Sequence, residues 1–262
     1  MSFPLFKTLI KQNWKLWAIF MGLLLFYMGI LIVIYDVMID FQETLESMPA
    51  ELGGIYGLEG WENALTYTAS FFFQQLVFVF SMIFYIMLSN KLVNKPVDNT
   101  SISAHLSSSM SRSKYIVTTG VFLISSIFAM FLVMFFVGGG LLFMWGTYSV
   151  LHWANLIFTT AMCSIMVAMV SFFFSAVFAG GRLGSGLLIG VPILFVTFNM
   201  LAGMADALSF LDWCNPFGYI DAVALASGSY NLWWLLNLGF IAISASLFVA
   251  SIFLFRKKQL NI

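Results

Sequence analysis

Residues 116–137 read IVTTGVFLISSIFAMFLVMFFV, a run of apolar and small residues without one charged side chain. A helix needs roughly 20 such residues to cross the hydrocarbon core of a bilayer, which is about 30 Å thick. Five further uncharged runs meet this criterion: 17–35, 69–89, 154–179, 185–205 and 232–255. Because the runs are apolar on every side and do not alternate, they predict helices rather than the strands of a membrane barrel.

The composition supports the same class of protein. Of the 262 residues, 61% are hydrophobic and only 8% are charged, whereas a soluble domain carries about 25% charged residues. So few charges cannot cover a surface that faces water. We therefore predict an all-α integral membrane protein with six transmembrane helices, formed by residues 1–262 as a single domain.

The charges are segregated along the chain. Placing the N-terminus in the cytoplasm puts all 11 lysines and arginines on the cytoplasmic side, as the positive-inside rule requires. These residues are Lys7, Lys11, Lys15, Lys91, Lys95, Arg112, Lys114, Arg182, Arg256, Lys257 and Lys258. Among the acidic residues only Asp98 then lies inside. This pattern predicts that both termini are cytoplasmic (N-in, C-in), and we expect a multi-pass protein of the cell (plasma) membrane.

Residues 1–16 have an amphipathic pattern. Lys7, Lys11 and Lys15 recur every four residues and so share one helical face, while residues such as Leu5 and Leu9 supply apolar surface. This periodicity predicts a helix that lies in the cytoplasmic interface with its lysines toward anionic headgroups. The alternative is a positively charged flank that only sets the topology.

The cytoplasmic loop 90–114 contains signals for a short helix of its own. We expect Pro96 to end the preceding helix, and Asp98, Asn99 or Thr100 to cap a new helix over residues 100–108. An isolated helix of this length is marginal in water. We therefore expect it to dock on a partner or on the bundle through Ile102 and Leu106.

Two outer segments differ in character. Residues 36–68 hold seven acidic residues and no basic one. They could attract a cationic peptide, or they could simply be acidic because the topology permits it. Residues 206–231 are rich in apolar side chains but are interrupted by Pro216 and Gly218. We expect this segment to dip into the membrane or pack over the bundle, where protein can satisfy its irregular backbone.

The sequence lacks most of the motifs that would indicate an enzyme. The glycine cluster at 180–184 lacks the Gly-Lys-Ser/Thr ending of a phosphate-binding loop, and no metal-ligand spacing occurs. His105 and His152 are predicted on opposite sides of the membrane, and Cys163 and Cys214 at different depths, so neither pair should share a site. We expect no enzyme activity, cofactor or metal in this chain.

The predicted helices also lack ionisable groups. Carriers driven by protons or sodium usually hold carboxylates or histidines at membrane depth. The strongly polar residues Gln74, Gln75 and Asn199 are candidates for a substrate pathway, although hydrogen bonds between helices are an alternative use of them. The pattern fits a transporter whose energy comes from another subunit.

Three short motifs, together with the order of the spans, resemble the permease subunits of ABC-2 type (type V) ATP-binding cassette transporters. Residues 97–114, VDNTSISAHLSSSMSRSK, are similar to the family pattern of an acidic residue, Gly/Thr, Leu-Leu, Pro and Ser-Arg-x-Lys. Thr100 stands for the usual glycine, and Ser109 or Met110 for the proline. The turn 213–217 (WCNPF) and the tail 255–260 (FRKKQL) also resemble family motifs.

The resemblance implies a function and a set of partners. The loop helix would be a coupling helix seated on a separate ABC ATPase dimer, which would hold ATP and Mg, and a second permease would complete a homo- or heterodimer within membrane lipid. No nucleic-acid partner is expected. The residues expected to contact the ATPase are Asp98, Thr100, Ile102, His105, Leu106 and Arg112.

Three functions remain to be compared. The leading hypothesis is an ATP-driven exporter of peptides, antibiotics or other hydrophobic or amphipathic compounds. The alternative is a non-transporting immunity or sensor protein that sequesters a peptide at its acidic outer loop. An intramembrane enzyme is disfavoured, because no nucleophile and base can be placed at matched depth.

Overall fold

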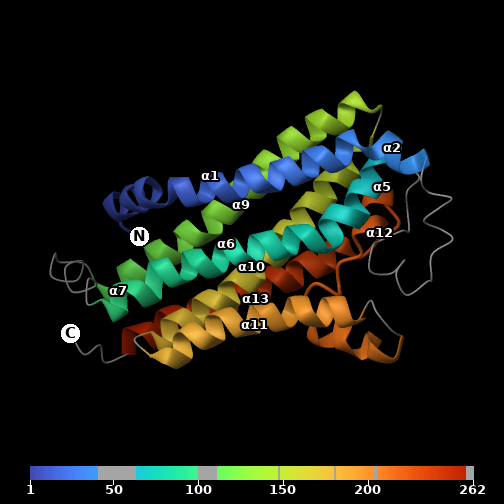
Figure 1. The fold of residues 1–262 in the computed structure, drawn as a ribbon. Coiled ribbons are helices and arrows are strands. Elements are labelled where there is room, and N and C mark those ends of the chain that lie inside the picture. Colours follow the sequence, from blue (N-terminus) through green and yellow to red (C-terminus); the bar gives the residue numbers. More distant parts are fainter. Residues whose placement is uncertain (41–62, 100–110, 147, 180, 203–205, 258–262) are drawn as a thin grey trace.

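The computed structural model describes residues 1–40, 63–99, 111–146, 148–179, 181–202 and 206–257 (Figure 1). Within these ranges the chain is all-α, and six helices are long and apolar enough to cross a membrane. The protein is therefore a multi-pass membrane protein, as the sequence predicts. Its elements in chain order are α1 (Phe3–Val33), α2 (Tyr35–Asp40), α5 (Ala64–Thr68), η1 (Ala69–Leu76), α6 (Val77–Ser89), η2 (Asn90–Asn94), α7 (Lys95–Asp98), α9 (Arg112–Met144), α10 (Val150–Phe178), α11 (Arg182–Ala202), η3 (Asp206–Cys214), α12 (Ala222–Ser227) and α13 (Trp233–Lys257).

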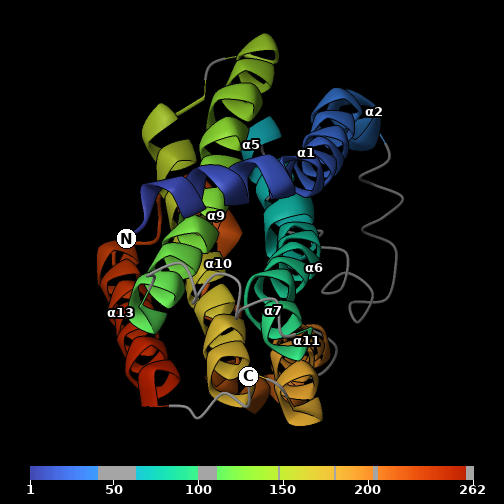
Figure 2. The same ribbon diagram turned by 90° about the vertical axis from the view of Figure 1, so that its left-hand side faces the viewer.

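Helix α10 is the centre of the bundle. In its most apolar stretch 67% of the residues are buried, against 22% in α1 and α13 and 11% in α11. It packs against α6, α9, α11, α12 and α13, and Figure 2 shows α10 between α6 and α13. Small residues on α10, such as Ala161, Ser164 and Ala168, are fully buried and let neighbouring helices approach closely.

The two ends of the bundle carry different elements. The first turn of α1, α7 and the last turn of α13 lie at one end, whereas α2, α5 and α12 lie at the other (Figure 1). Basic residues mark the first of these ends, since Lys95 lies in α7, Arg112 and Lys114 begin α9, and Arg256 and Lys257 end α13. This distribution agrees with the charge segregation on which the sequence argument depends.

Helix α1 joins two elements that the sequence separates. The predicted interfacial helix (1–16) and first span (17–35) form one helix, Phe3–Val33. In Figure 2 its first part runs crosswise to α6, α9 and α10, and its later part turns toward the far end of the bundle. The helix continues because no Gly-Pro or other stop signal stands between the two parts.

The second span is a composite of five helical segments. The predicted range 69–89 extends to Ala64–Asp98, and two of its segments, η1 and η2, are π-helical. The expectation that Pro96 ends this helix is wrong, because the helix ends at Asp98. Pro96 has no N–H group to donate to the Leu92 carbonyl four residues earlier, and this carbonyl accepts instead from the Tyr115 hydroxyl at 2.8 Å, so the helix tolerates the proline.

Candidate functional site

The expected ATPase-contact residues fall at one end of the bundle, but most of them lie outside the described residues. Thr100, Ile102, His105 and Leu106 belong to the range 100–110, which the structure does not describe. Asp98 is exposed at the end of α7. Arg112 is half-buried at the start of α9, where the side chain of Ser111 caps the helix by accepting from the Lys114 N–H at 3.3 Å.

The first part of α1 is amphipathic in the way that its sequence predicts. Leu5 and Leu9 are buried against the bundle, whereas Lys7, Lys11 and Lys15 are exposed. Three contacts anchor this part of the helix. The Ser2 N–H donates to Thr118 Oγ1 at 2.8 Å, the Phe6 and Phe122 rings meet edge to face, and Lys91 Nζ donates to the Gln12 carbonyl at 3.1 Å. The segment is thus fixed to α9 and η2.

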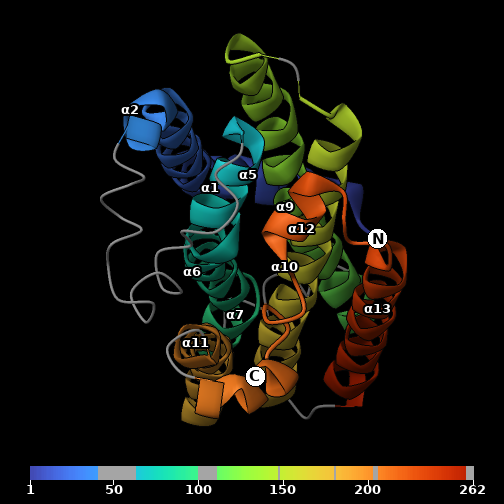
Figure 3. The ribbon, with the colours of Figure 1, turned by 90° about the vertical axis from the view of Figure 1, so that its right-hand side faces the viewer.

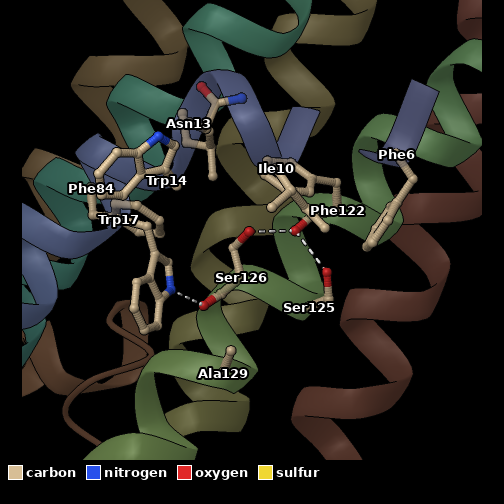
Figure 4. Close-up of a pocket in the computed structure, with 11 residues that line it drawn as sticks. Phe6, Ile10, Asn13, Trp14, Trp17, Phe84, Phe122, Ser125, Ser126 and Ala129 are labelled. Carbon is tan, nitrogen blue, oxygen red and sulfur yellow. Dashed lines mark hydrogen bonds between the residues drawn. The ribbon is translucent and has the colours of Figure 1, made fainter. Parts of the chain in front are cut away.

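An apolar groove opens where α1 crosses α6 and α9 (Figure 4). Its volume is about 310 Å³, and its lining residues are Phe6, Ile10, Asn13, Trp14, Trp17, Phe84, Leu88, Phe122, Ser125, Ser126 and Ala129. We call this surface the inner groove, because it lies in the half of the bundle that contains α7. Trp14 and Ile10 on its rim are exposed, so the groove is open to its surroundings.

The few polar groups of the inner groove bond to the helices that form it. Trp17 Nε1 donates to the Ser126 carbonyl at 3.0 Å, and the hydroxyls of Ser125 and Ser126 both donate to the Phe122 carbonyl (Figure 4). Asn13 Nδ2 donates to the Leu9 carbonyl at 2.8 Å, whereas Asn13 Oδ1 is buried without a partner. Apart from this oxygen, the groove presents mainly aromatic and aliphatic surface. Such a surface suits an acyl chain or an aromatic group rather than an ion.

The segment that follows η3 is inserted into the bundle, which confirms the expectation that residues 206–231 pack against it. Asn215, Pro216 and Phe217 are buried. The Phe217 ring lies 4.4 Å from that of Phe78, centroid to centroid, and the Cys163 thiol donates to the Pro216 carbonyl at 3.7 Å. We call residues 215–217 the Asn-Pro-Phe turn.

Two of the three substrate-pathway candidates hold the Asn-Pro-Phe turn and its continuation. Asn199 Oδ1 accepts from Asn215 Nδ2 at 3.0 Å, and Gln74 Oε1 accepts from the Ala222 N–H at 3.3 Å. Asn215 Oδ1 in turn accepts from the Phe217 N–H at 2.9 Å. Asn199 and Gln74 therefore bond between segments, which is the alternative use that the sequence leaves open. The side chain of Gln75 lies outside the described residues.

Helix α12 continues from this turn to the end of the bundle opposite α7. Figure 3 shows it beside α5 and α10, with Asp221 capping it by accepting from the Ala224 N–H at 2.8 Å. A polar cavity of about 260 Å³ lies nearby, and His152 and Ser227 are among its lining residues. The acidic residues between 41 and 62, which could attract a cationic peptide or simply be permitted by the topology, lie outside the described residues.

Several aromatic residues contact one another at the end of the bundle opposite α7. The Tyr35 and Tyr67 rings lie 5.4 Å apart, and Trp145 Nε1 donates to Asp36 Oδ2 at 3.1 Å.

Sequence reasoning missed the polar bonds that join distant helices. The sequence gives no sign that the indole of Trp17 bonds to α9, as it does through the Ser126 carbonyl. Asn237 Nδ2 of α13 donates to Thr159 Oγ1 of α10 at 2.9 Å. An asparagine in an apolar run is a signal for such a bond, but the partner cannot be chosen from the sequence because many hydroxyls lie at similar depth.

Comparisons with known proteins do not assign this chain to a group. No family, no curated protein and no solved structure matches it. Within the described ranges no three His, Cys, Asp or Glu side chains come together as a group that could hold a metal ion. Cys163, which is buried, and Cys214, which is exposed, form no disulfide.

Proposed function

We propose that this chain is the permease subunit of an ATP-driven transporter of the ABC-2 class, and that it exports peptides, antibiotics or other amphipathic compounds. The observation that carries the proposal is the arrangement at one end of the bundle. Three elements lie at this end: the crosswise first part of α1, the end of α7 and the start of α9. In the sequence, α7 precedes and α9 follows the loop that resembles a coupling loop.

The second span provides a physical connection from that loop to the interior. Its segments run from α5 to α7 without a break in the helix. A displacement of α7 would therefore also move the rest of this helix. The second span contacts α1, α10 and α11. A soluble ATPase that moved the loop would shift these contacts and change access to the interior, as rigid-body coupling does in other switching proteins.

The inner groove supports an apolar or amphipathic cargo. Its aromatic wall has no ionised side chain, and its rim is exposed on the bundle surface. A molecule dissolved in the inner half of the membrane could enter it sideways. In this proposal the plasma membrane is the site of action, and the working unit contains two permeases and two ATPases.

The assembly proposal is tested by the fate of the ATPase when the loop is changed. We expect a cytoplasmic ATPase to co-purify with the full chain in mild detergent, and to be lost when residues 100–108 are deleted or when Leu106→Ala is introduced. The matched control is Leu232→Ala, since Leu232 is exposed just before α13, at the other end of the bundle. An ATPase that stays bound after the deletion would show that the loop is not the docking element.

Filling the inner groove should separate cargo handling from assembly. Ala129 lines the groove at a half-buried position, so Ala129→Trp places an indole in the space that the cargo would use. We expect the cargo concentration that half-stimulates the ATPase to rise about tenfold, which corresponds to about 1.4 kcal/mol of lost binding free energy, because the indole occupies space that the cargo needs. Basal ATPase activity and subunit association should stay unchanged. Unaltered stimulation in Ala129→Trp would remove the groove from the pathway.

The immunity or sensor alternative predicts a different result. Neutralising Glu43, Glu46 and Glu51 would abolish protection against a cationic peptide in that case, whereas inactivating the ATPase would leave protection intact. Cargo-stimulated ATP hydrolysis by the purified complex would exclude it.

A further inference from the structure

Seven buried polar residues on the second and fourth spans have side-chain atoms without a hydrogen-bond partner. Each of these residues is at most 2% exposed, and each unpaired atom has less than 1 Å² of accessible surface, so water does not touch it either. We call this set the polar seam. Its members are Ser81, Tyr85, Ser89, Asn94, Ser164, Ser171 and Ser175.

The members of the polar seam form two stripes on helices that touch. On α6, Ser81, Tyr85 and Ser89 follow one another at intervals of four residues, and on α10 the three serines are spaced by seven and four. Both spacings keep side chains on one face of a helix. Helix α6 and η2 pack against α10, and Tyr85 lies close to Cys163, the neighbour of Ser164.

Buried hydroxyls elsewhere in the protein are satisfied locally. Thr160, Ser126 and Ser251 donate to the carbonyl four residues earlier, at 2.7–2.8 Å. Serines of the seam could turn to do the same. The Tyr85 phenol extends too far from its own helix for this, and Asn94 has both amide atoms unpaired. In the closed packing the Tyr85 hydroxyl and the Asn94 amide have therefore lost their hydrogen bonds to water and form none within the protein, which is unfavourable.

We propose that the polar seam is a closed cleft, and that α6 separates from α10 in a second arrangement in which these groups bond to water and to the polar part of the cargo. The unpaired groups of Tyr85 and Asn94 lower the free energy needed to open the interface, because opening gives both of them partners. The seam leads from the Asn-Pro-Phe turn, through Cys163, to Asn94 near the end of the second span that carries α7.

The chemistry of the seam selects the kind of group that it would take. Hydroxyl and amide groups line it, and neither α6 nor α10 contains Asp, Glu, Lys or Arg. Uncharged donors and acceptors such as peptide amides fit this lining, whereas a bare ion would lack a counter-charge. The cargo assignment rests on the proposed function, but the opening of the seam does not.

A matched pair of tyrosines tests whether the seam is unsatisfied when closed. Tyr85→Phe removes an unpaired hydroxyl and keeps the ring, so we expect the melting temperature of the purified chain in lipid nanodiscs to rise. Tyr115→Phe removes a hydroxyl that donates to the Leu92 carbonyl at 2.8 Å, so we expect it to fall. Ser171→Ala should change the melting temperature less than Tyr85→Phe does, because the Ser171 hydroxyl can turn to bond to its own helix.

The native thiol of Cys163 reports the opening. In a Cys214→Ser background, N-ethylmaleimide should label Cys163 slowly in the folded protein, since a buried group reacts through the open fraction. Tyr85→Phe favours the closed state and should slow labelling about tenfold, whereas Tyr115→Phe should not slow it. The proposal is overturned if Tyr85→Phe melts at a lower temperature, or if it labels as fast as the parent. Neither result would affect ATPase association, so a failure here is distinct from a failure of the proposed function.

Discussion

Gly138→Leu should destabilise the protein by about 3 kcal/mol, which is near the upper end of the usual cost of overpacking. Gly138 lies on α9 where α1 and α10 come closest to it. A Cβ atom at this position would stand 2.7 Å from the Trp153 ring and 2.9 Å from the Met28 methyl. Met28 is flexible, but Trp153 is fully buried, donates to the Phe135 carbonyl at 2.9 Å and meets Phe73 edge to face. The indole therefore cannot move aside without breaking other contacts.

Gly140→Leu is the control for this prediction. The two glycines are separated by one residue on the same helix, and a Cβ atom at Gly140 meets nothing within 4 Å. Leucine has a higher helix propensity than glycine, so this variant should be at least as stable as the parent. Thermal unfolding in detergent, followed by near-ultraviolet circular dichroism, measures both. Equal stability of the two variants would contradict the close packing of α1, α9 and α10 around Gly138.

Asn215→Leu should cost roughly 2–4 kcal/mol, because it leaves the buried Phe217 N–H and the Oδ1 of the half-buried Asn199 without partners, at about 1–3 kcal/mol for a buried group and less for a half-buried one. In the parent, one side-chain amide serves both: its Nδ2 donates to Asn199 on α11, and its Oδ1 accepts from the Phe217 N–H. Leucine has a similar size and can do neither. We expect the Asn-Pro-Phe turn to loosen and Phe217 to lose its contact with Phe78, which chymotryptic cleavage near the turn and thermal unfolding would both report.

A double-mutant cycle separates the two bonds of Asn215. Asn199→Leu removes only the first bond and should cost less than Asn215→Leu, and the double variant should cost less than the sum of the two, since the residues share that bond. Asn231→Leu, at an exposed position, should have little effect. Additive costs for Asn199 and Asn215 would show that the amides do not bond to each other.

Both predictions concern contacts that hold α10 at the centre. Gly138 permits α9 to approach Trp153 of α10, and Asn215 fixes a turn whose Pro216 carbonyl accepts from Cys163 of α10. The second span passes the same helix and continues to the loop that the proposed function assigns to an ATPase. A movement of that span relative to α10 would therefore change the packing in the interior of the bundle.

The sequence by itself determined the class of protein. Six uncharged runs of sufficient length must form helices in lipid, because every backbone N–H and C=O group needs a partner there and a helix supplies it within one segment. The sequence also predicted the amphipathic face of the first part of α1, since the four-residue spacing of Lys7, Lys11 and Lys15 is local. The unpaired state of Cys163 and Cys214 was predicted as well.

Only the tertiary structure decided which surfaces face protein and which face lipid. Runs that are apolar on every side carry no signal that would choose α10 as the buried centre and leave α11 at the edge, because lipid tails are as apolar as a protein interior. Contacts between residues far apart in the chain determine four features: the continuation of the helix through Pro96, the pairing of Asn199 with Asn215, the inner groove and the polar seam. Such contacts follow from packing between spans, whereas hydropathy describes each span alone.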